Sequence, residues 1–93
     1  MDLPINYKKL TWQSRLLVRL EYIRLQDGLC CYCGQSLDGN PPDEIMDIYI
    51  DRRLFPDNFF NYPVHLHHNH ETGMTIGAIH NRCNAVLWQY HHE

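Results

Sequence analysis

The pattern of hydrophobic and polar positions predicts a helix near the start of the chain. Apolar residues recur at helical spacing in a stripe that consists of Trp12, Leu16, Leu20 and Ile23 and is widened by Leu17. Thr11 suits the N-cap position before such a helix, and Gly28 is a stop signal after it. The first helix is therefore expected to run from Trp12 to Gln26.

Shorter elements follow, separated by turn-forming residues. Partial alternation over residues 45–51 favours a short strand, and weak alternation over residues 62–68 favours a second one. The sequence Glu71-Thr72-Gly73 predicts a turn, after which residues 74–76 form the return strand of a hairpin. The apolar positions from Asn81 to His91 predict a terminal helix.

Length and composition limit the fold to one small domain. The 93 residues are 44% hydrophobic and 20% charged, which is typical of a globular chain with a thin core. We expect an α+β domain over residues 1–93, with a helix at about 11–27 and the remaining core at about 28–91. The aliphatic run at residues 16–18 is too short to span a membrane, and the N-terminus lacks a signal-peptide pattern, so we expect a cytoplasmic protein.

The cysteines and one histidine have the spacing of metal ligands. Cys30 and Cys33 form a C-x-x-C pair, and His80 and Cys83 repeat that spacing far downstream. Two such pairs predict one structural zinc site with three cysteines and one histidine. A redox-active pair would need a strand-then-helix context, which is missing here. Cys31 competes with Cys30 for the ligand role, and the spacing favours Cys30.

A second cluster lies between the two pairs, in the sequence His67-His68-Asn69-His70. On a strand, alternate residues share a face, so His68 and His70 can point together while His67 points away unless the chain bends or bulges there. Asn84 follows the last cysteine directly, in the first turns of the expected terminal helix. A surface cluster and a second zinc site are the alternatives to a catalytic role for these histidines.

Charge is distributed unevenly along the chain. Eleven acidic residues against eight basic ones give a net charge of −3, and six of the acids lie in residues 38–57. Five of the basic residues lie between residues 8 and 24, so one end of the domain can carry a positive face. Arg15, Arg19 and Arg24 form either a solvated helix face or a contact surface for DNA phosphates.

The remaining aromatic and histidine residues carry less specific signals. We expect a small core, rather than a base-stacking surface, from Phe55, Phe59, Phe60, Tyr62 and Trp88. We expect surface positions, rather than metal binding, for His65, His91 and His92.

Together, the two ligand pairs and the histidine cluster resemble the HNH nucleases, and most closely their phage recombination endonuclease VII branch. The resemblance covers about residues 28–90 and depends on spacing, order and residue type at Cys30, Cys33, His67, His68, Asn69, His70, Glu71, Thr72, Gly73, Gly77, His80, Cys83 and Asn84. It implies a ββα-metal fold, in which a hairpin and a helix hold one catalytic metal beside a zinc knuckle.

The resemblance also implies roles for individual residues. His68 matches the general base that activates water, and His70 matches a histidine near the scissile phosphate. His67 and Asn84 match the ligands of the catalytic divalent cation. The expected catalytic cation is Mg²⁺, Mn²⁺ or a softer transition metal. The softer metal is included because His67 stands where this branch usually has aspartate, which leaves the metal site neutral. His80 replaces a cysteine, and Ile76 stands where many relatives carry arginine.

These expectations define two functions. The first is a metal-dependent DNA endonuclease that hydrolyses phosphodiester bonds by a one-metal mechanism, with His68 taking the proton from water. The alternative is a zinc-stabilised nucleic-acid-binding module without catalysis. Either protein would act on DNA, as a monomer or a small homo-oligomer, and a phage-encoded one would act in the bacterial host cell.

Overall fold

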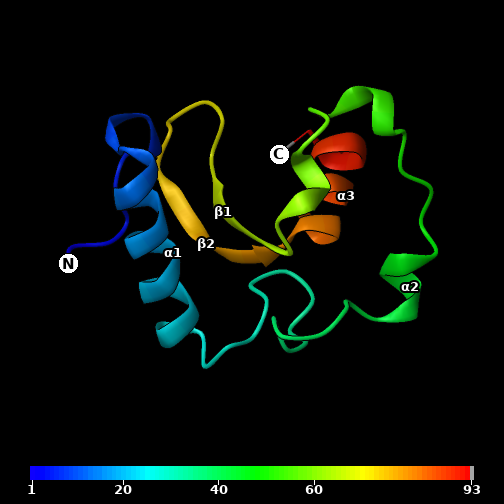
Figure 1. Cartoon of the computed structure of the whole chain (residues 1–93), viewed down its shortest axis with the longest axis horizontal. Coiled ribbons are helices and arrows are strands. Elements are labelled where there is room, and N and C mark those ends of the chain that lie inside the picture. The colour runs from blue at the N-terminus through cyan, green and yellow to red at the C-terminus, as the bar shows by residue number, and fades with distance from the viewer. Residues whose placement is uncertain (93) are drawn as a thin grey trace.

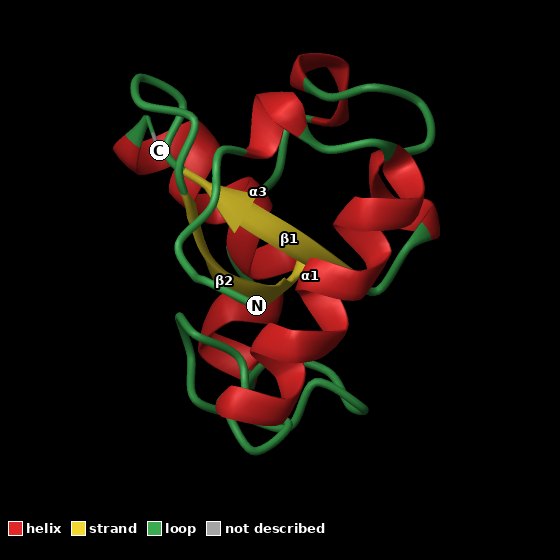
Figure 2. Ribbon diagram, turned by 90° about the vertical axis from the view of Figure 1, so that its left-hand side faces the viewer, coloured by secondary structure: helices red, strands yellow, loops and turns green. Residues whose placement is uncertain are grey.

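The structure is a computed structural model that describes residues 1–92, and it has a small α+β fold. Its elements in chain order are η1(Tyr7–Lys9), α1(Trp12–Leu25), α2(Asp43–Met46), η2(Arg52–Leu54), η3(Phe59–Asn61), β1(Val64–His68), β2(Thr75–His80) and α3(Asn81–His91). The β1–β2 hairpin lies in the middle, with α1 in front of it and α3 behind it in Figure 2. Figure 1 shows the same hairpin between the two helices from the side. Within residues 1–92, no helix is long and apolar enough to cross a membrane.

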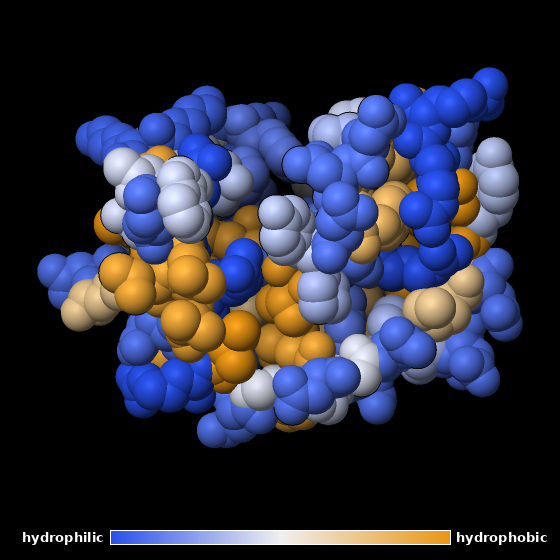
Figure 3. All heavy atoms as spheres, viewed as in Figure 1, coloured by the Kyte–Doolittle hydropathy of each residue, from blue (hydrophilic) through white to orange (hydrophobic). Residues whose placement is uncertain are grey.

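Helix α1 has the predicted ends but not the predicted buried face. The Thr11 side chain accepts a hydrogen bond from the Ser14 amide at 3.1 Å, so Thr11 is the N-cap. Gly28 adopts a φ of +73°, which ends the helix as expected. The buried residues of α1 are Val18 and Tyr22, whereas most of the apolar stripe is exposed, namely Trp12, Leu16, Leu17 and Leu20. A two-stranded hairpin covers only a narrow line along the helix, and Figure 3 shows hydrophobic side chains at the surface where α1 lies.

The strand predicted at residues 45–51 is wrong. Residues 43–46 form the short helix α2, which follows Pro42 and carries Asp43 and Glu44 in its first turn. Proline before the first turn and carboxylates near a helix N-terminus both favour helix over strand. The described sheet contains only β1 and β2, so this segment has no partner strand.

The predicted hairpin is confirmed, with a longer return strand than expected. β1 pairs antiparallel with β2, from Val64 opposite His80 to His68 opposite Thr75. The register shifts between His67 and His68: His67 lies opposite Gly77 and His68 opposite Thr75, so the extra residue of this bulge is Ile76 of β2 and not one of the histidines. The strand β2 continues to His80, so it leads directly into α3.

The N-terminal segment lies along the hairpin turn. The Tyr7 amide donates to the Gly73 carbonyl at 2.7 Å, and the Thr75 amide donates to the Ile5 carbonyl at 2.9 Å. The Tyr22 hydroxyl of α1 contacts the Thr75 hydroxyl at 2.8 Å. These contacts bring Tyr7 to the same end of the hairpin as the histidine cluster.

The side chain of Gln26 joins the end of α1 to β2. Its Nε2 donates to the Ala78 carbonyl at 2.9 Å, and its Oε1 accepts from the Ala78 amide at 2.8 Å. The amide group thus makes the pair of hydrogen bonds that a neighbouring strand would make. A Cβ on Gly77 would lie 2.6 Å from that Oε1, so this close approach requires glycine.

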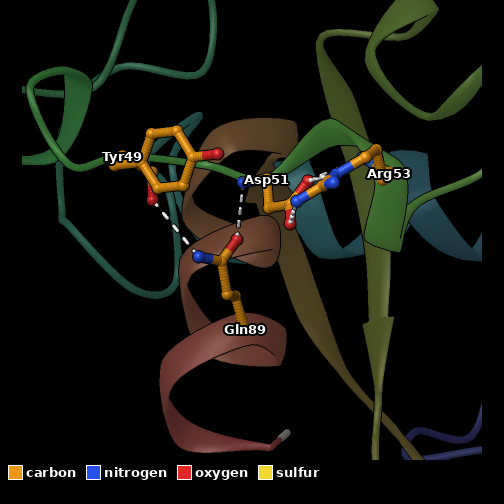
Figure 4. A network of polar contacts seen from close by, with 4 residues as sticks. All are labelled: Tyr49, Asp51, Arg53 and Gln89. Atoms are coloured by element: carbon orange, nitrogen blue, oxygen red, sulfur yellow. Dashed lines mark hydrogen bonds and ion pairs between the residues drawn. The ribbon is translucent and has the colours of Figure 1, made fainter.

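The loop between α2 and η2 is fixed to α3 by polar contacts, two of which Figure 4 shows. The Gln89 side chain accepts from the Asp51 amide at 3.0 Å and donates to the Tyr49 carbonyl at 3.4 Å. The Tyr90 hydroxyl donates to the same carbonyl at 2.6 Å. The expected aromatic core is present in part: Phe55, Phe59 and Phe60 pack against a buried cluster that includes Ala85 and Val86, whereas Tyr62 and Trp88 are exposed.

The Gln26 contact generates a stability prediction. Gly77→Ala should lower the free energy of unfolding by about 1–3 kcal/mol, because the new methyl group overpacks the site and displaces the Gln26 amide. Chemical denaturation of both proteins measures the difference. Gly39→Ala is the matched control, since a Cβ there meets no atom within 4 Å. Equal losses in the two variants would contradict the proposed role of Gly77.

Candidate functional site

The four predicted zinc ligands gather into one group. Cys30 and Cys33 lie in the loop after α1, His80 ends β2, and Cys83 lies in the first turn of α3. Their ligand atoms all lie within 4.8 Å of one another. The His80 Nδ1 is 3.4 Å from the Cys33 Sγ and 3.7 Å from the Cys83 Sγ. Tetrahedral zinc bonds imply a sulfur–nitrogen separation of about 3.6 Å, so the group could hold a zinc ion.

The His80 ring is oriented for this role by two backbone carbonyls. Its Nε2 lies 2.9 Å from the Ser36 carbonyl oxygen and 3.0 Å from that of Gly39. A carbonyl only accepts, so Nε2 carries the proton and Nδ1 directs its lone pair toward the sulfurs. A carbonyl that accepts from the outer ring nitrogen in this way fixes the tautomer that a metal needs.

Backbone amides also stabilise a thiolate at Cys30. Its Sγ accepts from the amides of Tyr32 at 3.4 Å and His80 at 3.5 Å. The neighbouring Cys83 thiol, followed by backbone amides that include these two, lowers the pKa of Cys30 to about 4. Cys31 lies outside the group, and desolvation raises its pKa to about 11. The structure thus selects Cys30 over Cys31, as the spacing predicted.

A cavity of about 770 Å³ is lined by residues of α1, β1 and α3 and of the segment that contains η2 and η3. It brings together three of the residues predicted for chemistry and two of those predicted to contact DNA, and His65 also lines it. The predicted residues are His68, His70, Asn84, Arg15 and Arg19. Arg24 is not among them, and it forms an exposed ion pair with Glu21.

His67 takes a different position from the other predicted residues. It is 5% exposed and lines a smaller hollow of about 190 Å³, together with His68 and His70. The two hollows adjoin, since His68 and His70 line both of them. Asn84 lines only the larger one, so the predicted pair of catalytic-metal ligands does not share a hollow.

His65 is a functional candidate that the sequence analysis missed. It is half-buried rather than at the surface, and its Nε2 lies 2.8 Å from the Phe59 carbonyl oxygen. The Nε2 therefore carries the proton, and Nδ1 accepts from the Asn84 side-chain amide at 3.1 Å. Burial lowers the pKa of His65, which favours this neutral form. The Asn84 Oδ1 is left as the atom available to a cation.

The His68 ring is held by stacking. It lies parallel to the Tyr7 ring, with centroids 3.9 Å apart and an interplanar angle of 6°. The Arg15 guanidinium lies 4.1 Å from the centre of the same Tyr7 ring. Burial, followed by the charge of the nearby His70, lowers the pKa of His68. No local pattern could have identified Tyr7, because its contact depends on the N-terminal segment reaching the hairpin.

Comparisons of the chain with protein-family models, with curated proteins and with solved structures gave no match. The likeness to the HNH nucleases therefore depends on the quoted residues alone.

The metal group generates a prediction with a built-in control. Cys83→Ser should remove tightly bound zinc and unfold the domain, since structural zinc contributes about 10–16 kcal/mol in small zinc peptides. Cys31→Ser should keep both metal and fold, because Cys31 is not in the group. Elemental analysis of the purified proteins and thermal unfolding make the comparison. Zinc-free wild-type protein that is folded would contradict the assignment.

Proposed function

We propose that this protein is a metal-dependent DNA endonuclease that hydrolyses phosphodiester bonds. The observation that carries the proposal is the shared cavity of His68, His70 and Asn84, with Arg15 and Arg19 in its lining. Phosphodiester hydrolysis needs an activated water, neutralised phosphate charge and help for the leaving oxygen. The cavity offers a base, a cation ligand and positive charge for these three needs.

His68 is the proposed general base. Its lowered pKa keeps the imidazole neutral near pH 7, so that a ring nitrogen can take the proton from water. The stacked Tyr7 ring fixes the plane of the imidazole. His70, whose ring centroid is 4.8 Å from that of His68, is proposed to contact the scissile phosphate.

Asn84 is the first proposed ligand of the catalytic divalent cation, and His67 could join it only if the cation lay where the two hollows adjoin, at His68 and His70. The contact with His65 fixes the Asn84 amide so that Oδ1, a hard oxygen donor, is the free end. His67 would contribute from the adjoining hollow, beside His68. A bound cation would neutralise charge on the phosphate and on the leaving oxygen. Two protein ligands leave other coordination positions for water and substrate.

Arg15 and Arg19 are the proposed phosphate contacts at the mouth of the cavity. Both are half-buried on the side of α1 that faces the histidines, so they are close to any phosphate that reaches His68. Arg24, which the sequence grouped with them, is paired with Glu21 and is left out of the proposal.

A cleavage assay tests the proposal. His68→Ala should lower the rate of supercoiled-plasmid nicking by about 10²–10⁴-fold, because proton transfer is lost while the metal and DNA contacts remain. His91→Ala, at an exposed position of α3, is the control and should nick at the wild-type rate. Zinc content and DNA affinity are measured on the same samples.

Two results would go against this assignment. Unchanged nicking by His68→Ala would remove the base role from His68. Wild-type protein that binds DNA but does not nick it with Mg²⁺, Mn²⁺, Co²⁺ or Ni²⁺ would indicate the zinc-stabilised binding module instead.

A further inference from the structure

The cavity beside the histidines is more aromatic than contact with a phosphate backbone requires. Its walls include Trp12 and Leu16 of α1, Tyr62 after η3, and Trp88 of α3. Trp12 is 71% exposed, Tyr62 60% and Trp88 42%, so parts of these rings are open to solvent. The sequence analysis assigned Tyr62 and Trp88 to a core, but their exposure leaves them available to a ligand.

The charged side chains that line the cavity indicate which kind of ligand it can bind. The chain has eleven acidic residues and eight basic ones, yet within residues 1–92 no aspartate or glutamate lines this cavity. Arg15 and Arg19 do line it. Aromatic walls with positive charge and no acid complement a ligand that combines a flat aromatic ring with a negative group.

We infer that the cavity holds an unpaired nucleobase of the DNA strand that is cut. Base stacking on exposed aromatic side chains is the usual way in which proteins hold single strands, with basic residues along the backbone. In an intact duplex the base faces are stacked on each other, and only their edges are open in the grooves. The preferred substrate is therefore single-stranded or locally unpaired DNA.

The position of the cavity relates this inference to the chemistry. His68 and His70 lie in the same lining as Trp12 and Tyr62, so a base inserted there brings the neighbouring phosphate to the histidines. The volume of about 770 Å³ is within the range of ligand pockets and has room for a base with its sugar. The identity of the polymer as DNA rests on the proposed function, whereas base insertion is tested separately from cleavage.

Tryptophan fluorescence gives a direct test, because the chain has two tryptophans and both line the cavity. The probes are a short single-stranded oligothymidylate, an abasic strand of equal length, and a blunt duplex, all without added divalent cation. The base-bearing strand should quench the emission and bind at least about tenfold more tightly than the abasic strand. Trp12→Ala should remove most of that preference.

Leu17→Ala is the matched control, since Leu17 is an exposed residue of α1 that does not line the cavity, and it should keep the preference. Equal affinity for the base-bearing and abasic strands, or tighter binding of the duplex, would overturn the inference. A third result would also overturn it. If dilution of the protein without DNA changed both its tryptophan emission and its sedimentation, a second copy of the chain would be covering the cavity.

The outcomes separate this inference from the nuclease itself. Plasmid nicking without base-dependent quenching would support the proposed function and reject the base-binding cavity. Base-dependent quenching in a protein that never cleaves DNA would support the cavity and reject the nuclease.

Discussion

The group formed by Cys30, Cys33, His80 and Cys83 is the constraint on which the rest of the molecule depends. It joins the loop after α1, which holds Cys30 and Cys33, to the junction of β2 and α3. That junction lies about fifty residues further along the chain. A domain of this size has a thin core, and here much of the apolar stripe on α1 remains outside it. A bound metal would supply the long-range connection that so small a core supplies weakly.

The same junction positions the candidate site. His80 ends β2 and Cys83 lies in the first turn of α3, so a metal bound by both would fix the angle at which α3 leaves the hairpin. Asn84 comes next in the chain, and its side chain donates to His65 of β1. The catalytic proposal thus depends on two sets of contacts. The metal group positions the start of α3, and the hydrogen bond to His65 orients the Asn84 side chain, so together they determine where its oxygen can point.

Local signals in the sequence predicted the features that depend on local structure. The Thr11 cap, the span of α3 and the ligand spacing all follow from neighbours in the chain. The failures depend on distant contacts. Residues 45–51 alternate like a strand but have no partner, α1 buries Val18 and Tyr22 because the hairpin is narrow, and Tyr7 reaches His68 only through the turn at Gly73.

The central claim is that metal at the four-residue group holds the hairpin and α3 together. Amide hydrogen exchange, measured on zinc-loaded protein and on protein stripped with a chelator, tests this most directly. We expect the stripped protein to lose protection throughout β2 and α3 together, because the metal group connects them. Protection of the Ala78 and Val86 amides that persists without metal would contradict the account.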